Sequence, residues 1–227
     1  MKTLFVTAHP DDEVLGCGGT IPRLVSEGHE VYIAILGEGI TSRYSQRDDA
    51  DKSLVDSLHK VSHKVSELLG ASDLFMYSLP DNRFDTIPLL DIVKIVEDLI
   101  SKIEPEAIYT HHGGDLNIDH SLIFRAVLTA TRLTEDCTVR SVYAFEVPSS
   151  TEWAFDKLQP PFHPNYFVNI SDQIDTKIEA MSLYDQEMRP FPHPRSEEAL
   201  RANATRWGSA VGVRSAEAFE LIRCVVK

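Results

Sequence analysis

The sequence has 227 residues, of which 43% are hydrophobic and 25% charged, an ordinary mixture for one globular domain with a full core. Its formal net charge is -13 and it contains no run of Lys or Arg, which argues against a nucleic acid or an anionic membrane as partner. Its three cysteines lie far apart and form no CxxC pair, so we expect neither a disulfide framework nor a cysteine-based metal site.

The same features predict where the protein works. Unpaired cysteines suit a reducing compartment, so we expect a cytoplasmic location. The apolar run at the start of the chain ends at His9, which is too short for the apolar core of an export signal. No stretch approaches the length of a membrane span.

Strand-like and helix-like segments alternate through the first two thirds of the chain. We expect strands near residues 4–8, 31–36, 74–77, 107–110 and 140–145, and helices near 14–25, 47–69, 87–103 and 122–133. This alternation predicts an α/β fold that is Rossmann-like, with a mostly parallel sheet and helices on both faces.

The alternation stops after residue 146. Segment 146–168 contains four prolines and ends in the strand-like residues 166–168. Helices near 171–185 and 197–207 and a final strand near 219–226 complete the chain. We interpret residues 1–227 as a single domain, with a core over 1–145 and an elaborated C-terminal third, 146–227, that shapes the substrate pocket. Within it, we expect 146–200 to fold over the edge that carries the motif loops.

The first motif loop, His9-Pro10-Asp11-Asp12-Glu13, falls where the first strand turns into a helix. Crowded carboxylates repel one another unless a cation or a proton separates them, and Gly, Asn or Ser would turn the chain more cheaply. A bound divalent metal removes this conflict, and neutral His with carboxylate is a good ligand pair for zinc. The alternative, an acidic helix start that complements the helix dipole, accounts for Glu13 but not for His9.

A second loop rich in His and Asp, residues 110–120, also follows a strand and precedes a helix. Both loops therefore open at the carboxyl ends of parallel strands, where open α/β sheets place their ligands. His9, Asp12 and one histidine of the second loop would form a site of three protein ligands with an open position, which is the catalytic arrangement of zinc.

The two loops give the chain a resemblance to the PIG-L/LmbE-like zinc N-deacetylases. The resemblance is carried by Ala8-His9-Pro10-Asp11-Asp12-Glu13 with the following Gly16, and by Asp119-His120. The order of these motifs along roughly the first 145 residues also matches.

This resemblance implies a set of roles. It implies that His9, Asp12 and His120 bind Zn²⁺, with other divalent metals as alternatives, and that Asp11 is the general base. It also implies hydrolysis of the N-acetyl group of an amino sugar, free or in a glycoconjugate. Metal-bound water reaches a pKa of roughly 7, and a carboxylate outside the coordination sphere then accepts its proton. Asp115 and Asp119 are expected to orient a ligand imidazole or the loop.

One departure from the family concerns the general acid, the group that protonates the leaving amine. Members often carry a histidine three residues before the last ligand, where this chain has Asn117. An Asn amide donates a hydrogen bond to an oxyanion but cannot supply a proton. The proton must then come from Asp11 or from another group. We expect His193 of the Pro-rich segment to reach the pocket, with His112 and His163 as other candidates.

Two further loops carry candidate substrate contacts. Arg43 follows the second strand and Asp81 the third, and in the resembled family an Arg and an Asp in these places contact sugar hydroxyls. Arg83, Glu146 and Arg195 are additional candidates from neighbouring loops. The expected partner is a small-molecule or glycoconjugate substrate, and the sequence is compatible with a homo-oligomer.

Three alternatives account for the sequence less well. His9, Asp11 and a distant histidine also fit a two-His-one-carboxylate iron oxygenase, but such sites usually occur in jelly rolls rather than α/β folds. A dinucleotide site is disfavoured because Gly16, Gly18 and Gly19 lie beyond the turn, inside the helix. A non-catalytic metal- or sugar-binding protein would be expected to lack Asp11, which is present.

Overall fold

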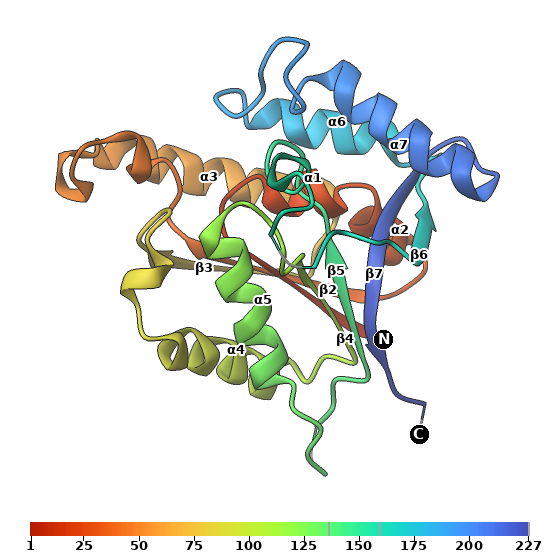
Figure 1. Cartoon of the computed structure of the whole chain (residues 1–227), viewed down its shortest axis with the longest axis horizontal. Helices are drawn as coiled ribbons and strands as arrows, with labels where there is room; N and C mark the ends of the chain where they lie inside the picture. The colour runs from red at the N-terminus through yellow and green to blue at the C-terminus, as the bar shows by residue number, and fades with distance from the viewer. Residues whose placement is uncertain (136, 159, 227) are drawn as a thin grey trace.

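The computed structural model describes residues 1–135, 137–158 and 160–226. Its centre is a seven-stranded sheet in the order β3-β2-β1-β4-β5-β7-β6 (Figure 1). The first five strands are parallel neighbours, while β7 runs antiparallel to both β5 and β6. The strands are β1 Lys2–Thr7, β2 Glu30–Gly37, β3 Asp73–Leu79, β4 Ala107–His111, β5 Ser141–Phe145, β6 Tyr166–Asn169 and β7 Ala216–Cys224. The prediction of a mostly parallel α/β sheet is confirmed.

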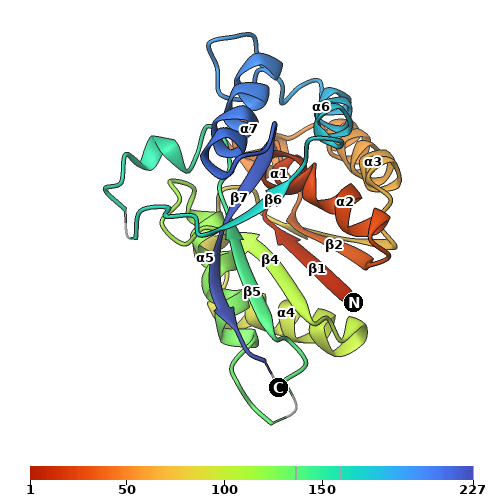
Figure 2. The same ribbon diagram turned by 90° about the vertical axis from the view of Figure 1, so that its right-hand side faces the viewer.

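Helices cover both faces of this sheet, in three layers (Figures 1 and 2). Two helices pack on one face, with apolar side chains that join one buried cluster: α4 Leu89–Ile103 and α5 Ile118–Ala130. The other face carries α1 Asp12–Cys17, α2 Thr20–Ser26, α3 Lys52–Leu69, α6 Ile174–Leu183 and α7 Glu197–Val211.

Strand β1 shows why the sheet is enclosed in this way. Leu4 and Val6 belong to the cluster under α4 and α5, whereas Phe5, between them, belongs to the cluster on the opposite face. All three side chains are fully buried. Successive strand residues point to opposite faces, so an unbroken apolar run is what a strand covered on both sides requires.

The first predicted helix is in fact two helices, with a break at Gly18 and Gly19. A Cβ on Gly19 would lie only 2.8 Å from the Ile170 side chain. The new helix start is satisfied from far away in the chain, because the backbone N–H groups of Gly19 and Thr20 donate to the Glu217 carboxylate at 3.0 and 2.7 Å. The predicted helix is thus divided into α1 and α2 by tertiary contacts, which the spacing of apolar residues does not predict.

Other helix boundaries move because of capping residues. The fourth predicted helix begins at Ile118 rather than near 122, since the Asn117 side chain accepts a hydrogen bond from Asp119 N. Helix α3 begins at Lys52 rather than near 47, with Asp51 as its cap. The residues before α3 form two 3₁₀ turns instead, η1 Thr41–Arg43 and η2 Arg47–Asp49. Two further 3₁₀ turns are η3 Phe84–Thr86 and η4 Glu152–Ala154.

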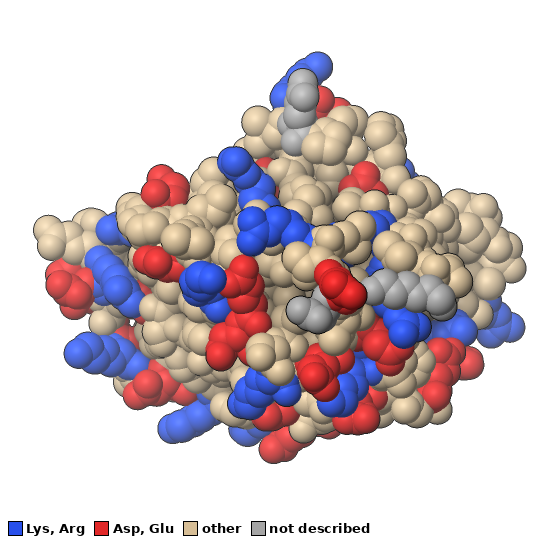
Figure 3. Space-filling model, turned by 90° about the horizontal axis from the view of Figure 1, so that it is seen from below, with Lys and Arg blue, Asp and Glu red and all other residues tan. Residues whose placement is uncertain are grey.

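The C-terminal third extends the same sheet through β6 and β7 and lays α6 and α7 beside α1 (Figure 2). Among the described residues, no helix combines the length and hydropathy of a membrane span. On the α4 side, Lys and Arg side chains are interspersed with Asp and Glu (Figure 3). Mixed charge of this kind does not concentrate the positive potential that recruits a nucleic acid.

Candidate metal centre and its cleft

The motif loops meet at the carboxyl ends of β1 and β4, the point where the strand order reverses direction. The chain leaves β1 toward one face of the sheet and leaves β4 toward the other face. The loops after the two strands therefore diverge and leave a crevice between them. A cleft of about 200 Å³ lies there. It is lined by His9, Pro10, Asp11, Gly39, Ile40, Ser42, Arg43, Leu58, Asp81, Asn82, Asn117, Glu187 and Arg195.

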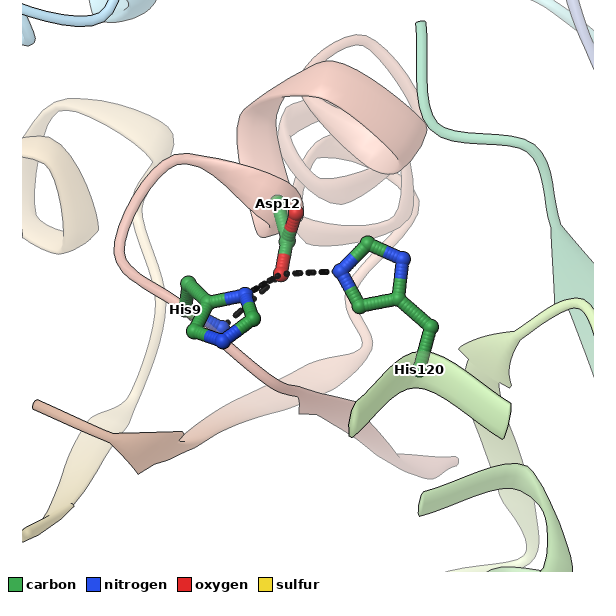
Figure 4. A group of neighbouring side chains, drawn as sticks. All are labelled: His9, Asp12 and His120. Carbon is green, nitrogen blue, oxygen red and sulfur yellow. Dashed lines mark hydrogen bonds and ion pairs between the residues drawn. The ribbon is translucent and has the colours of Figure 1, made fainter. Parts of the chain in front are cut away.

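Three side chains converge beside this cleft (Figure 4): His9, which lines it, and the buried Asp12 and His120. Asp12 Oδ2 lies 3.4 Å from His9 Nδ1 and 3.3 Å from His120 Nε2. One ligand atom from each of the three lies within 4.8 Å of the others. Donors placed about 2 Å from one tetrahedral ion would be about 3.3 Å apart, so the spacing suits a single metal ion.

The outer nitrogen of each histidine faces a carboxylate. His9 Nε2 lies 3.0 Å from Asp119 Oδ2, and His120 Nδ1 lies 3.1 Å from Asp115 Oδ1. A carboxylate at the outer nitrogen holds the N–H there and leaves the lone pair on the inner nitrogen, which is the one that faces Asp12. Asp119 and Asp115 thus each contact the outer nitrogen of one of the two histidines.

Both carboxylates are themselves fixed by hydrogen bonds. Asp119 accepts from the backbone N–H groups of Asn82 and Phe84 at 2.7 and 3.0 Å, which ties the loop after β3 to α5. Asp115 accepts from Asn117 N at 2.8 Å, from Thr151 Oγ1 at 2.6 Å and from Ser150 Oγ. The orientation of each imidazole is thus set by a network of backbone and hydroxyl donors.

The electrostatics of this group fit a cation. Burial lowers the pKa of His120, but the charges of Asp12 and Asp115 outweigh it and raise the pKa to about 9. Burial raises the pKa of Asp12, but the charges of His120 and His111 outweigh it and hold the pKa well below its usual range. Among the described residues, both ring nitrogens of His120 are buried without a hydrogen bond, and their nearest charged neighbours are Asp12 at Nε2 and Asp115 at Nδ1. A buried polar atom of this kind calls for an unseen partner, and two imidazoles with one carboxylate form a donor set of catalytic zinc.

His111 and His112, the other histidines of the second loop, are engaged elsewhere. His111 Nε2 accepts a hydrogen bond from Ala8 N at 2.8 Å, and its ring stacks on His120 with centroids 3.9 Å apart. His112 lies between Glu220 Oε2 at 2.8 Å and the Pro160 carbonyl at 2.7 Å. Of the three histidines, His120 is the one that reaches Asp12 with a free nitrogen. The candidate acid His163 contributes only its backbone N–H, to Glu220.

Asp11 occupies the cleft in a strained backbone conformation. Its φ is 109°, a region that non-glycine residues rarely adopt. Burial raises the pKa of Asp11, although the neighbouring Arg195 guanidinium opposes that shift. Glu13 holds the strained backbone, because its Oε2 accepts from Asp11 N at 3.1 Å. Glu13 is anchored in turn by the Tyr184 hydroxyl, which donates to its Oε1 at 2.7 Å.

The residues expected to contact substrate have different surroundings. Arg43 lines the cleft and pairs with Glu187. Asp81 lines it too, but its Oδ2 accepts from Ser42 N and Oγ at 3.0 and 2.7 Å, and its Oδ1 lies 3.2 Å from His9 Nε2. Asp81 therefore also braces His9.

A second donor group, His9, Asp81 and Asp119, lies on the other side of the His9 ring. Its carboxylate oxygens already accept hydrogen bonds from Asn82 and Ser42. The group that contains His120 Nε2 is the better metal site, because there a nitrogen is left without a partner.

Asn117 lines the cleft at the start of α5. Its Oδ1 is committed to capping the helix, while its Nδ2 donates to Asn82 Oδ1 at 2.9 Å. The second hydrogen of Nδ2 is left for another acceptor.

The structure does not bring His193 into the cleft. His193 Nδ1 accepts from Arg195 N at 3.1 Å, and the ring packs edge-on against Trp153 at a centroid distance of 5.6 Å. The residue of the Pro-rich segment that enters is Arg195, whose Nη1 lies 2.7 Å from Asp11 Oδ2. The Pro-rich segment therefore reaches the cleft through Arg195, whereas the His193 side chain lies outside it.

Two other candidates also lie outside the cleft. Arg83 is exposed beside η3, and Glu146 accepts hydrogen bonds from Asn203 and Trp207. Conversely, Glu187 lines the cleft between Arg43 and Arg195 and was not anticipated. No motif marks Glu187, so only its position after α6 reveals it.

Comparisons with known proteins indicate the family and the fold of this chain. The family model described as "PIG-L: GlcNAc-PI de-N-acetylase" matches residues 4–131, which include all three converging side chains. A curated relative, "Uncharacterized deacetylase YaiS" of Escherichia coli (strain K12), is 29% identical over 80% of this chain and 89% of its own.

Two solved structures show the same fold. The N,N'-diacetylchitobiose deacetylase from Pyrococcus horikoshii has a TM-score of 0.78 at 20% identity and covers 98% of this chain and 84% of its own. GalB of Pseudomonas putida KT2440, a 4-carboxy-2-hydroxymuconate hydratase, has a TM-score of 0.77 at 22% identity and covers 100% of this chain and 98% of its own. Because one neighbour is a deacetylase and the other a hydratase, the fold alone does not decide the reaction.

Proposed function

The chain belongs to the PIG-L family of de-N-acetylases, and from this premise we propose that it is a zinc-dependent hydrolase that removes the acetyl group from an N-acetylated amino sugar or glycoconjugate. The observation that carries the proposal is the convergence of His9 Nδ1, Asp12 Oδ2 and His120 Nε2 beside a cleft that His9 and Asp11 line. The N-acetyl sugar as substrate is supported by the family description and by the diacetylchitobiose deacetylase with the same fold.

His9, Asp12 and His120 would hold the ion. When bound, a divalent metal would act as a Lewis acid and lower the pKa of its bound water to roughly 7. Asp119 and Asp115 would hold the N–H of each imidazole on its outer nitrogen and fix the orientation of the ring.

Asp11 would accept the proton of the attacking water. Its carboxylate lies in the cleft, next in sequence to a ligand but turned toward Arg195 rather than toward His9. Water adds to the amide carbon, and the carbon–nitrogen bond then breaks. The leaving amine takes a proton, so that acetate and the free amino sugar are released. With no histidine supplied by position 117 or 193, Asp11 would return the proton it has accepted.

Arg43 and Asn117 would hold the substrate over this centre. Both side chains line the cleft, from different loops. The Arg43 guanidinium pairs with Glu187, and Asn117 Nδ2 donates to Asn82 Oδ1. Hydrogen bonds of this kind match sugar hydroxyls and an acetyl oxygen.

Acetate release tests the proposal. The purified protein would be incubated with a panel of N-acetylated amino sugars and glycoconjugates, before and after dialysis against a chelator and after return of Zn²⁺. We expect release from at least one class, its loss with chelator and its recovery with metal. Absence of release across the panel by metal-loaded protein would contradict the proposal.

A further inference from the structure

We propose that Arg195 is a positioning residue for Asp11, fixing the carboxylate of the base in the cleft. This inference rests on the proposed function and goes beyond it, since it gives a role to a side chain of the C-terminal third. Arg195 Nη1 lies 2.7 Å from Asp11 Oδ2, although the two residues are 184 positions apart in the chain. Their side chains are 22% and 4% exposed, so water screens the contact weakly.

Arg195 is itself held at several points. Its Nε donates to Ser149 Oγ at 2.8 Å, and its Nη1 lies 3.3 Å from Glu187 Oε2. Its backbone N–H donates to His193 Nδ1 at 3.1 Å. The next residue, Ser196, caps helix α7. A planar guanidinium fixed by partners on different edges has one orientation, and a lysine cannot reproduce it.

Asp11 needs such a partner. Its side chain is only 4% exposed and lies near three other carboxylates, those of Asp12, Glu13 and Glu187. Among the described residues, Arg195 is the hydrogen-bond and ion-pair partner of the Asp11 side chain. The guanidinium engages Oδ2 and leaves Oδ1 as the oxygen that accepts the proton of water. Misplacing a catalytic group by about 1 Å costs on the order of 10²-fold in rate, so loss of the Arg195–Asp11 contact should lower kcat.

A double-mutant cycle tests whether Arg195 acts through Asp11. Arg195→Gln, Asp11→Asn and the double variant would be compared with wild type by acetate release, zinc content and urea unfolding. We expect Arg195→Gln to lower kcat by on the order of 10²-fold, with KM and zinc content nearly unchanged. In the Asp11→Asn background the same change should lower kcat by less than about 3-fold, because a residue that acts through another adds nothing once that residue is gone.

Two further variants sharpen the test. Arg195→Lys should lower kcat less than Arg195→Gln but should not reach the wild-type value. Lysine keeps the positive charge but lacks the planar set of N–H donors of a guanidinium. Arg189→Gln is the matched control in the same segment, because Arg189 is exposed and bonds only the backbone carbonyls of Gln186 and Met188.

The outcomes separate this inference from the proposed function. Equal losses of kcat in both backgrounds would overturn the inference, because Arg195 would then act on the substrate directly. Unchanged kcat with a lower free energy of unfolding would also overturn it, leaving Arg195 a structural ion pair. Wild-type protein that releases no acetate would overturn the proposed function and this inference together, whereas active wild type with fully active Arg195→Gln would overturn this inference alone.

Discussion

Asp115 Oδ1 lies 3.1 Å from His120 Nδ1, on the side of the imidazole that faces away from Asp12. Burial raises the pKa of Asp115, but His120 and the hydroxyl donors around it outweigh burial and lower the pKa to about 2. Asp115 is therefore a carboxylate at every physiological pH. It keeps the N–H of His120 on Nδ1 and the lone pair on Nε2.

Asp115→Asn should weaken metal binding without removing a ligand. We expect zinc affinity to fall by about 10–100-fold, the usual cost of losing an outer-shell carboxylate. Competition with a chromogenic chelator measures it. Asp98→Asn is the control, because Asp98 is exposed on α4. Unchanged affinity in Asp115→Asn would show that His120 is oriented by its stacking on His111 instead.

The two adjacent aspartates should separate by role. Asp12→Asn should lose most of the bound zinc, whereas Asp11→Asn should retain it and lower kcat by about 10²–10⁴-fold, the worth of a positioned base. Asn tolerates the left-handed backbone at position 11 better than most residues, so the variant should fold. Elemental analysis beside steady-state kinetics decides the matter. If Asp11→Asn lost the metal and Asp12→Asn kept it, the roles would be reversed.

The convergence of His9, Asp12 and His120 was predictable because it depends on chain order. Parallel strands bring their carboxyl ends to one edge, so a loop after β1 and a loop after β4 must meet wherever those strands are neighbours. The choice of His120 over His111 and His112 could not be made from spacing alone. It depends on which imidazole nitrogen is consumed by Ala8 N or Glu220, and these are tertiary contacts.

The C-terminal contribution to the cleft was harder to predict for the same reason. Arg195 and His193 stand two residues apart in one Pro-rich segment, and the sequence gives no reason for one rather than the other to face Asp11. The choice depends on the position of Trp153, which packs against the His193 ring. Glu187 carries no motif at all, and its role appears only when the end of α6 is placed beside Arg43.

His193 should therefore contribute little to turnover. His193→Asn keeps an acceptor near the position of Nδ1, so the bond from Arg195 N should persist. We expect kcat to stay within about 3-fold of wild type, well below the 10²–10⁴-fold that a general acid supplies. Steady-state kinetics over pH 6–9 give the comparison. A loss of about 10²-fold or more with unchanged zinc content would restore His193 as the acid.

The contact between His112 and Glu220 should make stability depend on pH. Burial lowers the pKa of His112, but the hydrogen bond to Glu220 and its charge outweigh burial, and the net shift is upward. Because the folded pKa is raised, the contribution to stability is fully present below the unfolded pKa of about 6.5 and is lost as pH rises through the folded pKa.

Glu220→Gln should thus cost more stability at pH 6 than at pH 9. A charge-assisted hydrogen bond contributes about 1.5–3 kcal/mol, and we expect a loss in that range at pH 6 and a smaller one at pH 9. Urea unfolding at both pH values measures the difference. Glu27→Gln is the control, because Glu27 pairs with Arg23, which stays charged throughout. Equal losses at both pH values would mean that His112 is neutral in the folded state.

The buried pair of Lys177 and Glu217 should be strongly coupled. Lys177 Nζ lies 2.6 Å from Glu217 Oε1 and 2.8 Å from the Leu15 carbonyl, and the two side chains are 7% and 5% exposed. Lys177→Met leaves a buried carboxylate without its cation, so we expect a loss of about 3–5 kcal/mol in the free energy of unfolding. In the Glu217→Gln background the same change removes an unpaired buried cation, and the loss should fall to about zero or reverse sign.

Lys94→Met is the control, since Lys94 forms an exposed pair with Glu97 and its removal should have little effect. An equal loss from Lys177→Met in both backgrounds, measured by urea denaturation, would show that Lys177 acts through its bond to the Leu15 carbonyl and its packing rather than through Glu217.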